Sequence, residues 1–146
     1  MIHVENSAII GRPVEDVWAF VSDVRNEPRW HTDIINIRSA SEPADAPASW
    51  VLGAVWLVTV QFMGRREYEV EITGLEETRL IEMTTRTGPV RPKATYLFEP
   101  ANEGTRFTRR VDLPLRGLLR VLGPMMRRDV RNRNARFVSN LRRLLE

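Results

Sequence analysis

Residues 117–146, GLLRVLGPMMRRDVRNRNARFVSNLRRLLE, decide how this chain folds. Apolar side chains recur there at helical spacing and leave the arginines on the other side, which predicts one long amphipathic helix. The members of this apolar stripe are Leu118, Leu122, Met125, Met126, Val130, Phe137, Leu141, Leu144 and Leu145. An amphipathic helix needs an apolar surface to lie on, so the rest of the chain should supply one.

A sheet between Val51 and Asp112 can supply that surface, because segments of period two are separated there by turn-length breaks. Residues 67–72, EYEVEI, alternate strictly and give their strand one polar and one apolar face. Two short helices are expected near 13–23 and 26–30, after the first strand. The predicted strands are 3–10, 34–39, 51–63, 66–73, 80–86, 93–99 and 105–113.

Length and composition limit the classes of protein. At 146 residues we expect one domain, 1–146. The absence of cysteine excludes disulfides, thiolate catalysis and cysteine metal sites. The amino terminus lacks the pattern of a secretory signal, and the longest apolar run is well below the ~18 residues of a membrane span. A cytoplasmic location is the resulting expectation.

The net charge of +3 is unevenly distributed. From Pro114 onward there are nine arginines and two acids, 9 − 2 = +7, whereas the remainder has 13 basic and 17 acidic residues, 13 − 17 = −4. Two interpretations stay open: a solvated helix face, or a patch for phosphates or anionic lipid headgroups with peripheral membrane contact. No aromatic residues interleave with these arginines as stacking platforms for bases, which argues against nucleic acid.

Sequence motifs of known chemistries are absent. The chain has no nucleophile elbow, phosphate-binding glycine-rich loop, His-Glu-x-x-His or dinucleotide fingerprint. With only His3 and His31, no histidine-rich metal centre can form. His31 is therefore interpreted as a surface or hinge residue. We expect no metal and no cofactor, and no catalytic residue is assigned.

The apolar face of the sheet and helix is the best candidate for ligand contact. Large apolar side chains and adaptable thioethers suit an apolar or aromatic guest, and tyrosine hydroxyls can orient it. Plain core packing also explains each residue taken singly, and Trp30 either closes the pocket or plugs the core. The candidate ligand-binding residues are Trp30, Trp56, Tyr68, Met83, Tyr96, Phe98, Phe107, Arg109, Met126 and Asn134.

Two of these candidates are polar residues at positions predicted to face inward. Asn134 interrupts the helical stripe, so it faces a wet cavity or a ligand's polar group, or else it bonds the sheet. Arg109 lies two residues after Phe107 on the same predicted strand, so both side chains should point to the same face. There Arg109 can pair with an anionic group of a guest, or with an internal acid such as Asp112 or Glu82. We rank the internal pairing first.

Two segments are expected to interrupt regular structure. Gly123-Pro124 should break or kink the terminal helix between Leu122 and Met125, because proline lacks an amide donor and restricts the residue before it. The piece 115–122 can then move as a flap over one cavity mouth. Residues 41–49, SEPADAPAS, favour no regular element, and we expect a mobile loop.

Several local phrases, together with the order of elements, resemble a known superfamily. The phrases are IGRPVEDVW at 10–18, PRW at 28–30, YLFEP at 96–100, GTR at 104–106 and GLL at 117–119. The chain resembles the START-like (SRPBCC) superfamily, which includes polyketide cyclase/dehydrase and lipid-transport proteins and the birch-pollen allergen fold. The resemblance implies an α+β helix-grip fold, in which a curved antiparallel sheet of about seven strands wraps on a long C-terminal helix and encloses a hydrophobic cavity.

Two functional classes follow, and a third is weaker. The first is binding or transport of a small hydrophobic, lipid-like or polyketide-like molecule in the cavity. The second is a cyclase or dehydratase that holds a polyketide-like or aromatic substrate while a polar residue moves a proton. The third is a partner-binding protein that uses the arginine face. We favour binding, because the apolar face shows no convincing acid/base pair; ligand identity and oligomeric state stay open.

Overall fold

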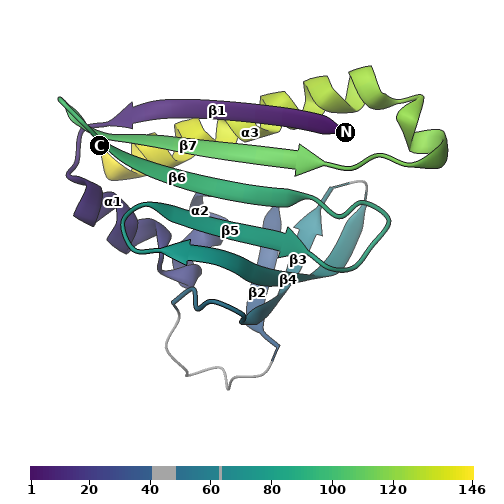
Figure 1. Ribbon diagram of the computed structural model, residues 1–146, viewed down its shortest axis with the longest axis horizontal. Helices are drawn as coiled ribbons and strands as arrows, with labels where there is room; N and C mark the ends of the chain where they lie inside the picture. Colours follow the sequence, from purple (N-terminus) through teal and green to yellow (C-terminus); the bar gives the residue numbers. More distant parts are fainter. Residues whose placement is uncertain (41–48, 63) are drawn as a thin grey trace.

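A computed structural model describes residues 1–40, 49–62 and 64–146 of the chain. Its elements follow the predicted order (Figure 1). The strands are β1 (Ile2–Ile10), β2 (Ile34–Ser39), β3 (Val55–Gln61), β4 (Arg65–Glu76), β5 (Leu80–Thr85), β6 (Lys93–Ala101) and β7 (Gly104–Leu113). The helices are α1 (Val14–Val21), η1 (Val24–Asn26), α2 (Glu27–Trp30), η2 (Gly117–Arg120) and α3 (Gly123–Leu145), of which η1 and η2 are 3₁₀ turns.

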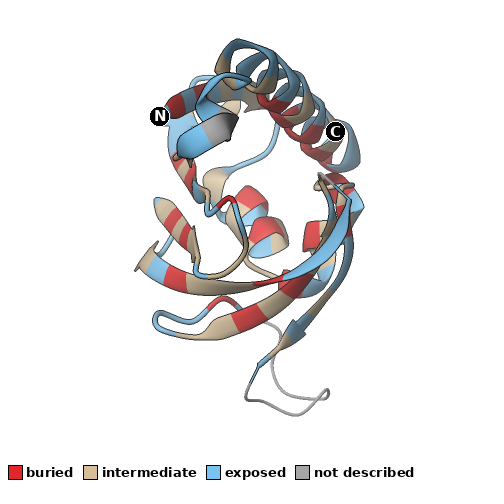
Figure 2. Cartoon of the chain, turned by 90° about the vertical axis from the view of Figure 1, so that its right-hand side faces the viewer, coloured by how far each residue is buried: buried red, intermediate tan, exposed pale blue. Residues whose placement is uncertain are grey.

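The seven strands form one antiparallel sheet in the order β1-β7-β6-β5-β4-β3-β2. The sheet curves strongly, and α3 lies across its open side, along β1 and β7 (Figure 2). The predicted α+β helix-grip fold is therefore confirmed. The apolar run 51–63 yields only the strand 55–61, because Gly53 adopts a positive φ of 85° in a turn before it.

The two short helices lie between β1 and β2, as expected. Glu15 and Asp16 occupy the first turn of α1, where the helix dipole favours acids. The same helix buries Val17 and Val21 against the core. The connection to β2 then places α2 beneath the concave face of the sheet, in contact with α3 and β2. Residues 41–48 of the expected mobile loop lie outside the described residues.

The terminal helix buries a narrower stripe than the sequence predicted. Its buried residues are Val130, Asn134, Phe137, Val138, Leu141 and Leu145. Leu122, Met125 and Leu144 are instead exposed, and the side chain of Leu118 lies outside the described part. Met125 is five residues before Val130, about 140° around the helix, so it cannot share that residue's contact with the sheet.

The break predicted between Leu122 and Met125 is present two residues earlier than expected. The 3₁₀ turn η2 ends at Arg120 and α3 begins at Gly123, so Pro124 sits in the first turn. Proline is tolerated there because the first amides of a helix have no intrahelical partner. Among the described residues, no helix has the length and apolar character needed to cross a membrane.

Candidate functional site

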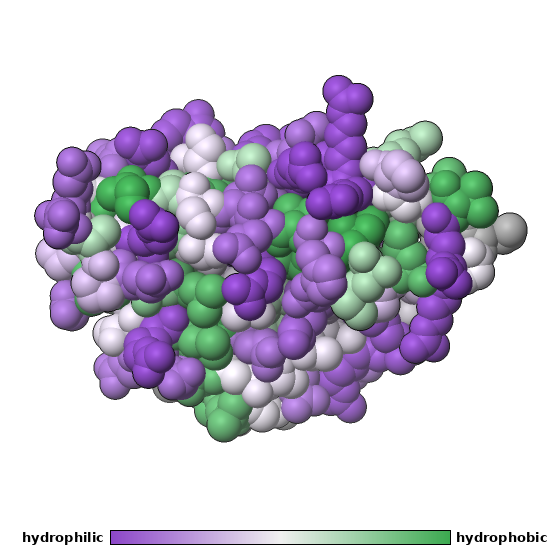
Figure 3. Space-filling model, turned by 45° about the horizontal axis from the view of Figure 1, so that its top comes forward, coloured by the Kyte–Doolittle hydropathy of each residue, from purple (hydrophilic) through white to green (hydrophobic). Residues whose placement is uncertain are grey.

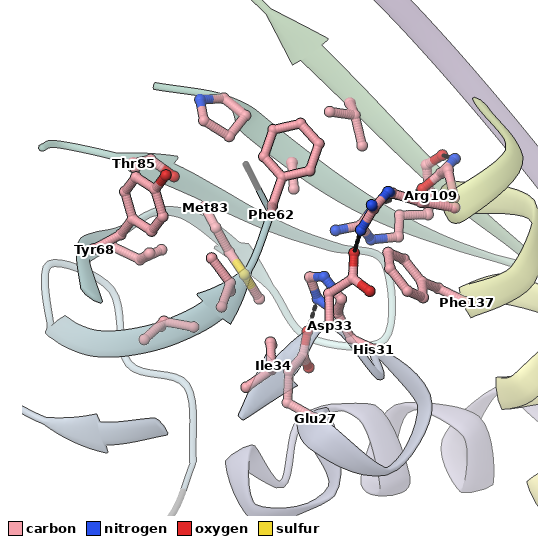
Figure 4. A pocket seen from close by; sticks show the side chains of 18 of the residues that line it. Glu27, His31, Asp33, Ile34, Phe62, Tyr68, Met83, Thr85, Arg109 and Phe137 are labelled. Carbon is pink, nitrogen blue, oxygen red and sulfur yellow. Dashed lines mark hydrogen bonds and ion pairs between the residues drawn. The ribbon is translucent and has the colours of Figure 1, made fainter. Parts of the chain in front are cut away.

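The space predicted beneath the terminal helix is present as a cavity of about 170 Å³ between the sheet and α3. Most of its wall is apolar. Val58, Tyr68, Met83 and Ala94 line it from four successive strands, and Phe137 lines it from α3. These side chains point inward because alternate residues of a strand share one face. Figure 4 shows the cavity with Tyr68 and Met83 on one side and Arg109 and Phe137 on the other.

Polar side chains gather on one side of this apolar space, and we call them the polar cluster. Its members are Glu27 from α2, His31 just after α2, Tyr96 from β6, Arg109 from β7 and Asn134 from α3. Glu27, Tyr96, Arg109 and Asn134 are buried, and the His31 side chain is 16% exposed. Five polar groups from distant parts of the chain therefore meet away from bulk water.

Glu27 is the acid of the polar cluster. Tyr96 donates its phenolic hydrogen bond to Oε1 of Glu27, whereas Oε2 has no hydrogen-bond partner among the described residues. Burial raises the pKa of the Glu27 carboxyl to about 7, although the Tyr96 hydrogen bond and the Arg109 charge oppose the rise. Near neutral pH, this carboxyl therefore exists in both protonation states.

Arg109 is the cation of the polar cluster. Its Nη1 donates to Oδ1 of Asn134 at 2.5 Å, and its guanidinium lies 5.7 Å from the Tyr96 ring and 5.4 Å from the Phe137 ring. Both ring contacts are cation–π interactions. The Nε atom is buried and has no hydrogen-bond partner among the described residues. One donor of a buried cation is thus available on this side of the cavity.

The expected internal acids for Arg109 were wrong. Asp112 pairs with His3, and Glu82 pairs with Lys93 at 3.1 Å. Asp112 is three residues from Arg109 and so points to the opposite face of β7. The acid whose charge acts on Arg109 is Glu27, which reaches the concave face from a helix rather than from a strand.

Asn134 bonds the sheet, which is one of the interpretations made from the sequence. Its Nδ2 donates to Oδ1 of Asn6 at 2.7 Å and to the backbone carbonyl of Arg109 at 2.9 Å. It also lines the cavity. The amide therefore ties α3 to β1 and β7 and fixes the Arg109 guanidinium at the same time.

His31 is not the surface or hinge residue that the sequence predicted. Its ring packs 4.3 Å from the Phe137 ring, and its Nδ1 lies 4.0 Å from Oε1 of Glu27. Burial, and then the Arg109 charge, lowers the pKa of the imidazole well below its usual value. His31 is therefore neutral at pH 7. Within residues 1–40, 49–62 and 64–146, no three His, Asp or Glu side chains are grouped to hold a metal ion.

Arg133, the residue before Asn134 in α3, pairs with Asp33. Its Nη1 donates to Oδ2 of Asp33 at 2.6 Å, and its guanidinium lies 5.3 Å from the Phe62 ring. Arg136 reaches the other oxygen of the same carboxylate at 3.3 Å. Asp33, Phe62 and Arg133 all line the cavity. These contacts join α3 to the start of β2 and form one edge of the cavity.

Five of the ten candidate ligand-binding residues line the cavity, and five do not. Trp30 is fully buried, with its ring 5.3 Å from Tyr96 and 5.8 Å from Phe107. These large rings fill the space between the sheet and the short helices, so they support lining residues. Those lining the cavity are Tyr68, Met83, Tyr96, Arg109 and Asn134; those outside its lining are Trp30, Trp56, Phe98, Phe107 and Met126.

Glu27 and His31 were missed by the sequence analysis. They are four residues apart and so share one side of a helical turn, which is the single local signal available. A four-residue helix rich in charge normally faces solvent, so nothing in its sequence indicates that α2 is turned inward. Binding was favoured over catalysis because the inner face showed no convincing acid/base pair. Glu27 and His31 place two such groups there.

Solved structures with the same fold include proteins of low sequence identity. A START superfamily protein from Mycobacterium smegmatis is 14% identical, with a TM-score of 0.80 over 99% of this chain and 97% of that one. A protein from Thermus thermophilus is 15% identical (TM-score 0.75, 98% and 96% covered), and Ara h 8.0201 is also 15% identical (TM-score 0.71, 98% and 96% covered).

Sequence comparison identifies the family. A search of curated proteins found no match. The family model described as polyketide cyclase / dehydrase and lipid transport matches residues 1–146, the whole chain. This family is part of the START-like superfamily that the local phrases resembled. The curved sheet, the cavity beneath α3 and the full-length match agree, and the chain belongs to the polyketide cyclase / dehydrase and lipid transport family.

Proposed function

We propose that this protein binds a small, mainly apolar molecule that carries one polar group, in the cavity between the sheet and α3. The observation that carries the proposal is the division of the cavity wall. Apolar side chains line most of it, and the polar cluster occupies one side. Ligand sites commonly combine an apolar pocket with a few placed polar groups that fix the ligand's orientation.

The cavity volume limits the size of the guest. An engineered apolar cavity of about 150 Å³ binds benzene. The cavity here, at about 170 Å³, suits a guest built around one aromatic ring or a short aliphatic chain.

The polar cluster favours an oxygen-bearing group on the guest. Nε of Arg109 has no hydrogen-bond partner in the ranges that the structure describes, and a carbonyl, hydroxyl or carboxylate oxygen of the guest would accept from it. Oε2 of Glu27 accepts a hydrogen bond when ionised and donates one when protonated. A hydroxyl or carbonyl next to an aromatic ring would satisfy these two groups together.

A second candidate function, proton transfer on such a guest, is favoured by Glu27. With a pKa of about 7, its carboxylate is suited to remove a proton from a carbon next to a carbonyl. The C–H proton goes to Oε2, the electron pair forms the enolate, and Arg109 stabilises the charge on the enolate oxygen. Enolate formation of this kind precedes ring closure in cyclisation chemistry.

Filling the cavity should abolish binding. Ala94 lines the cavity on β6, so Ala94→Phe places a ring in the space a guest would occupy. We expect guest affinity to fall at least about tenfold, because a bulky side chain and a guest cannot share that volume. Wild type and Ala94→Phe are each purified from the protein's own source. Native mass spectrometry then measures how much guest each protein retains.

The control is Leu97→Phe, which also places a phenylalanine ring on this strand but on its other face. It should retain the guest. Equal retention by both variants would contradict the proposed site.

Exchange of a ketone's α-hydrogens for deuterium tests whether the protein is an enzyme or only a binding protein. 2-Tetralone, an aromatic ketone with exchangeable α-hydrogens, serves as the probe, and exchange in D₂O is followed by NMR. If Glu27 acts as base, the wild type accelerates exchange while Glu27→Gln loses the acceleration and still binds the ketone. If the protein only binds its guest, both proteins leave the exchange rate unchanged.

A further inference from the structure

The start of α3 presents an exposed surface that is both apolar and basic, and we call it the α3 tip. It consists of Val121, Leu122, Met125, Arg120, Arg127 and Arg128. Val121 is 77% exposed and Met125 is 70% exposed. Figure 3 shows hydrophobic atoms between hydrophilic side chains at the end of the molecule where α3 begins. The exposed residues of the predicted apolar stripe are therefore concentrated mainly here.

The arginines of the α3 tip differ from those in the second half of the helix. Arg133 and Arg136 bond Asp33, and Arg142 bonds Glu146. Arg120, Arg127 and Arg128, by contrast, form no ion pair or hydrogen bond with any residue in the described ranges. Residues 113–128 also contain no acid. The positive charge of the tip is thus not compensated within the described part of the protein.

This combination fits one kind of partner. Arginines attract anionic lipid headgroups, and exposed aliphatic and methionine side chains beside them can enter the boundary between headgroups and acyl chains. Single-stranded nucleic acid would instead call for aromatic side chains beside the arginines, and the tip has none. We infer that the α3 tip docks on an anionic lipid bilayer.

The tip is continuous with the wall of the cavity. Leu115 and Met126 pack against a buried cluster that includes Val111, Leu113 and Val130. The last three residues also line the cavity. A protein docked through the α3 tip therefore has this end of its cavity next to the bilayer. Docking goes beyond the proposed function and does not require that any guest be bound.

Vesicle flotation tests the inference. We expect the protein to float with vesicles of equal parts phosphatidylcholine and phosphatidylglycerol, but not with pure phosphatidylcholine. Arg127→Glu/Arg128→Glu should weaken binding on the order of 100-fold, because each basic residue near an anionic surface contributes appreciably to affinity. Leu122→Ser/Met125→Ser should weaken it roughly tenfold through lost apolar contact. All four side chains are exposed, so the fold should be unaffected.

The control is Arg106→Glu/Arg143→Glu, which makes the same change in net charge at exposed positions near the opposite end of α3. It should float as the wild type does. Ala94→Phe, which closes the cavity, should also float, so loss of guest binding and loss of docking are distinguishable. Equal weakening by the control would overturn the inference. Unchanged vesicle binding by Leu122→Ser/Met125→Ser would also overturn it. Binding would then be purely electrostatic, and such a surface accepts nucleic acid or an acidic protein equally well.

Discussion

Replacing Phe107 with alanine is expected to lower the free energy of unfolding by about 3–5 kcal/mol. Phe107 is fully buried, and its ring lies between those of Trp30, Tyr96 and Phe98 at 5.8, 5.8 and 5.4 Å. Its removal deletes the apolar contact and leaves a void that these large rings cannot close without leaving their rotamers. Urea denaturation at pH 7 measures the loss.

Phe20→Ala provides the comparison. Phe20 is only half-buried and contacts the guanidinium of Arg29 at 5.2 Å, so its truncation should cost less than half as much. A loss below about 1 kcal/mol for Phe107→Ala would show that the aromatic layer behind the cavity is loosely packed. In that case the cavity wall would not be the rigid surface that ligand orientation requires.

Glu27 should make stability fall as the pH rises from about 4.5 to about 7. The ordinary pKa of glutamate is 4.5, and the folded protein holds this carboxyl at about 7. Between these values the unfolded chain has lost the proton while the folded protein keeps it. The contribution is fully present below 4.5, is lost as the pH rises through 7, and amounts to about 3 kcal/mol.

His31 acts in the opposite direction. Its folded pKa is lowered, so its contribution is present above the ordinary histidine value of 6.5 and is lost as the pH falls below it. The two effects overlap near pH 6, and the wild-type curve alone cannot separate them. Glu27→Gln removes only the first effect, because glutamine does not titrate and still accepts the Tyr96 hydrogen bond.

The measurement is urea denaturation of wild type, Glu27→Gln and His31→Asn at several pH values from 4 to 8. We expect the stability of wild type relative to Glu27→Gln to decrease steadily up to pH 7 and then level off. Relative to His31→Asn, wild type should instead gain stability as the pH rises. A constant difference between wild type and Glu27→Gln would mean that the carboxyl titrates normally and that its environment is wetter than the structure indicates.

The acid of the polar cluster connects the two candidate functions. A buried carboxyl with a pKa of about 7 destabilises the protein when ionised, and proteins keep such groups chiefly where chemistry or binding needs them. At the same cavity wall, Oε2 of Glu27 and Nε of Arg109 both lack a hydrogen-bond partner within the described part of the chain. The isotope-exchange experiment therefore decides whether this arrangement moves a proton or only orients a guest.

The fold could be predicted from local patterns in the chain. Strict alternation over 67–72 gave β4 its two faces, and helical spacing after Val130 gave α3 its buried side. Pro124 indicated the break before the terminal helix. Each of these signals comes from near neighbours in the sequence, because backbone geometry alone fixes which side chains share a face. The family resemblance rested on equally local phrases.

The candidate site was only partly predictable. Strand parity correctly placed Tyr96 and Arg109 inward, and the interrupted stripe pointed to Asn134. Alternation along a strand does not show which inward residues border open space, so Phe107 was grouped with residues that line the cavity. That distinction depends on how rings from three different elements fill the interior, and no single element contains the information.

The sequence by itself determined the strands, the terminal helix, its break and the concentration of arginines near the carboxyl end. Only the tertiary structure decided that the four-residue helix α2 turns Glu27 inward beneath Tyr96, and that Asp33 pairs with Arg133 and Arg136 but not with the arginines of the tip. The reason is physical. Burial and charge pairing arise between residues more than 100 positions apart, and local patterning cannot register contacts that exist only after the sheet has curved around them.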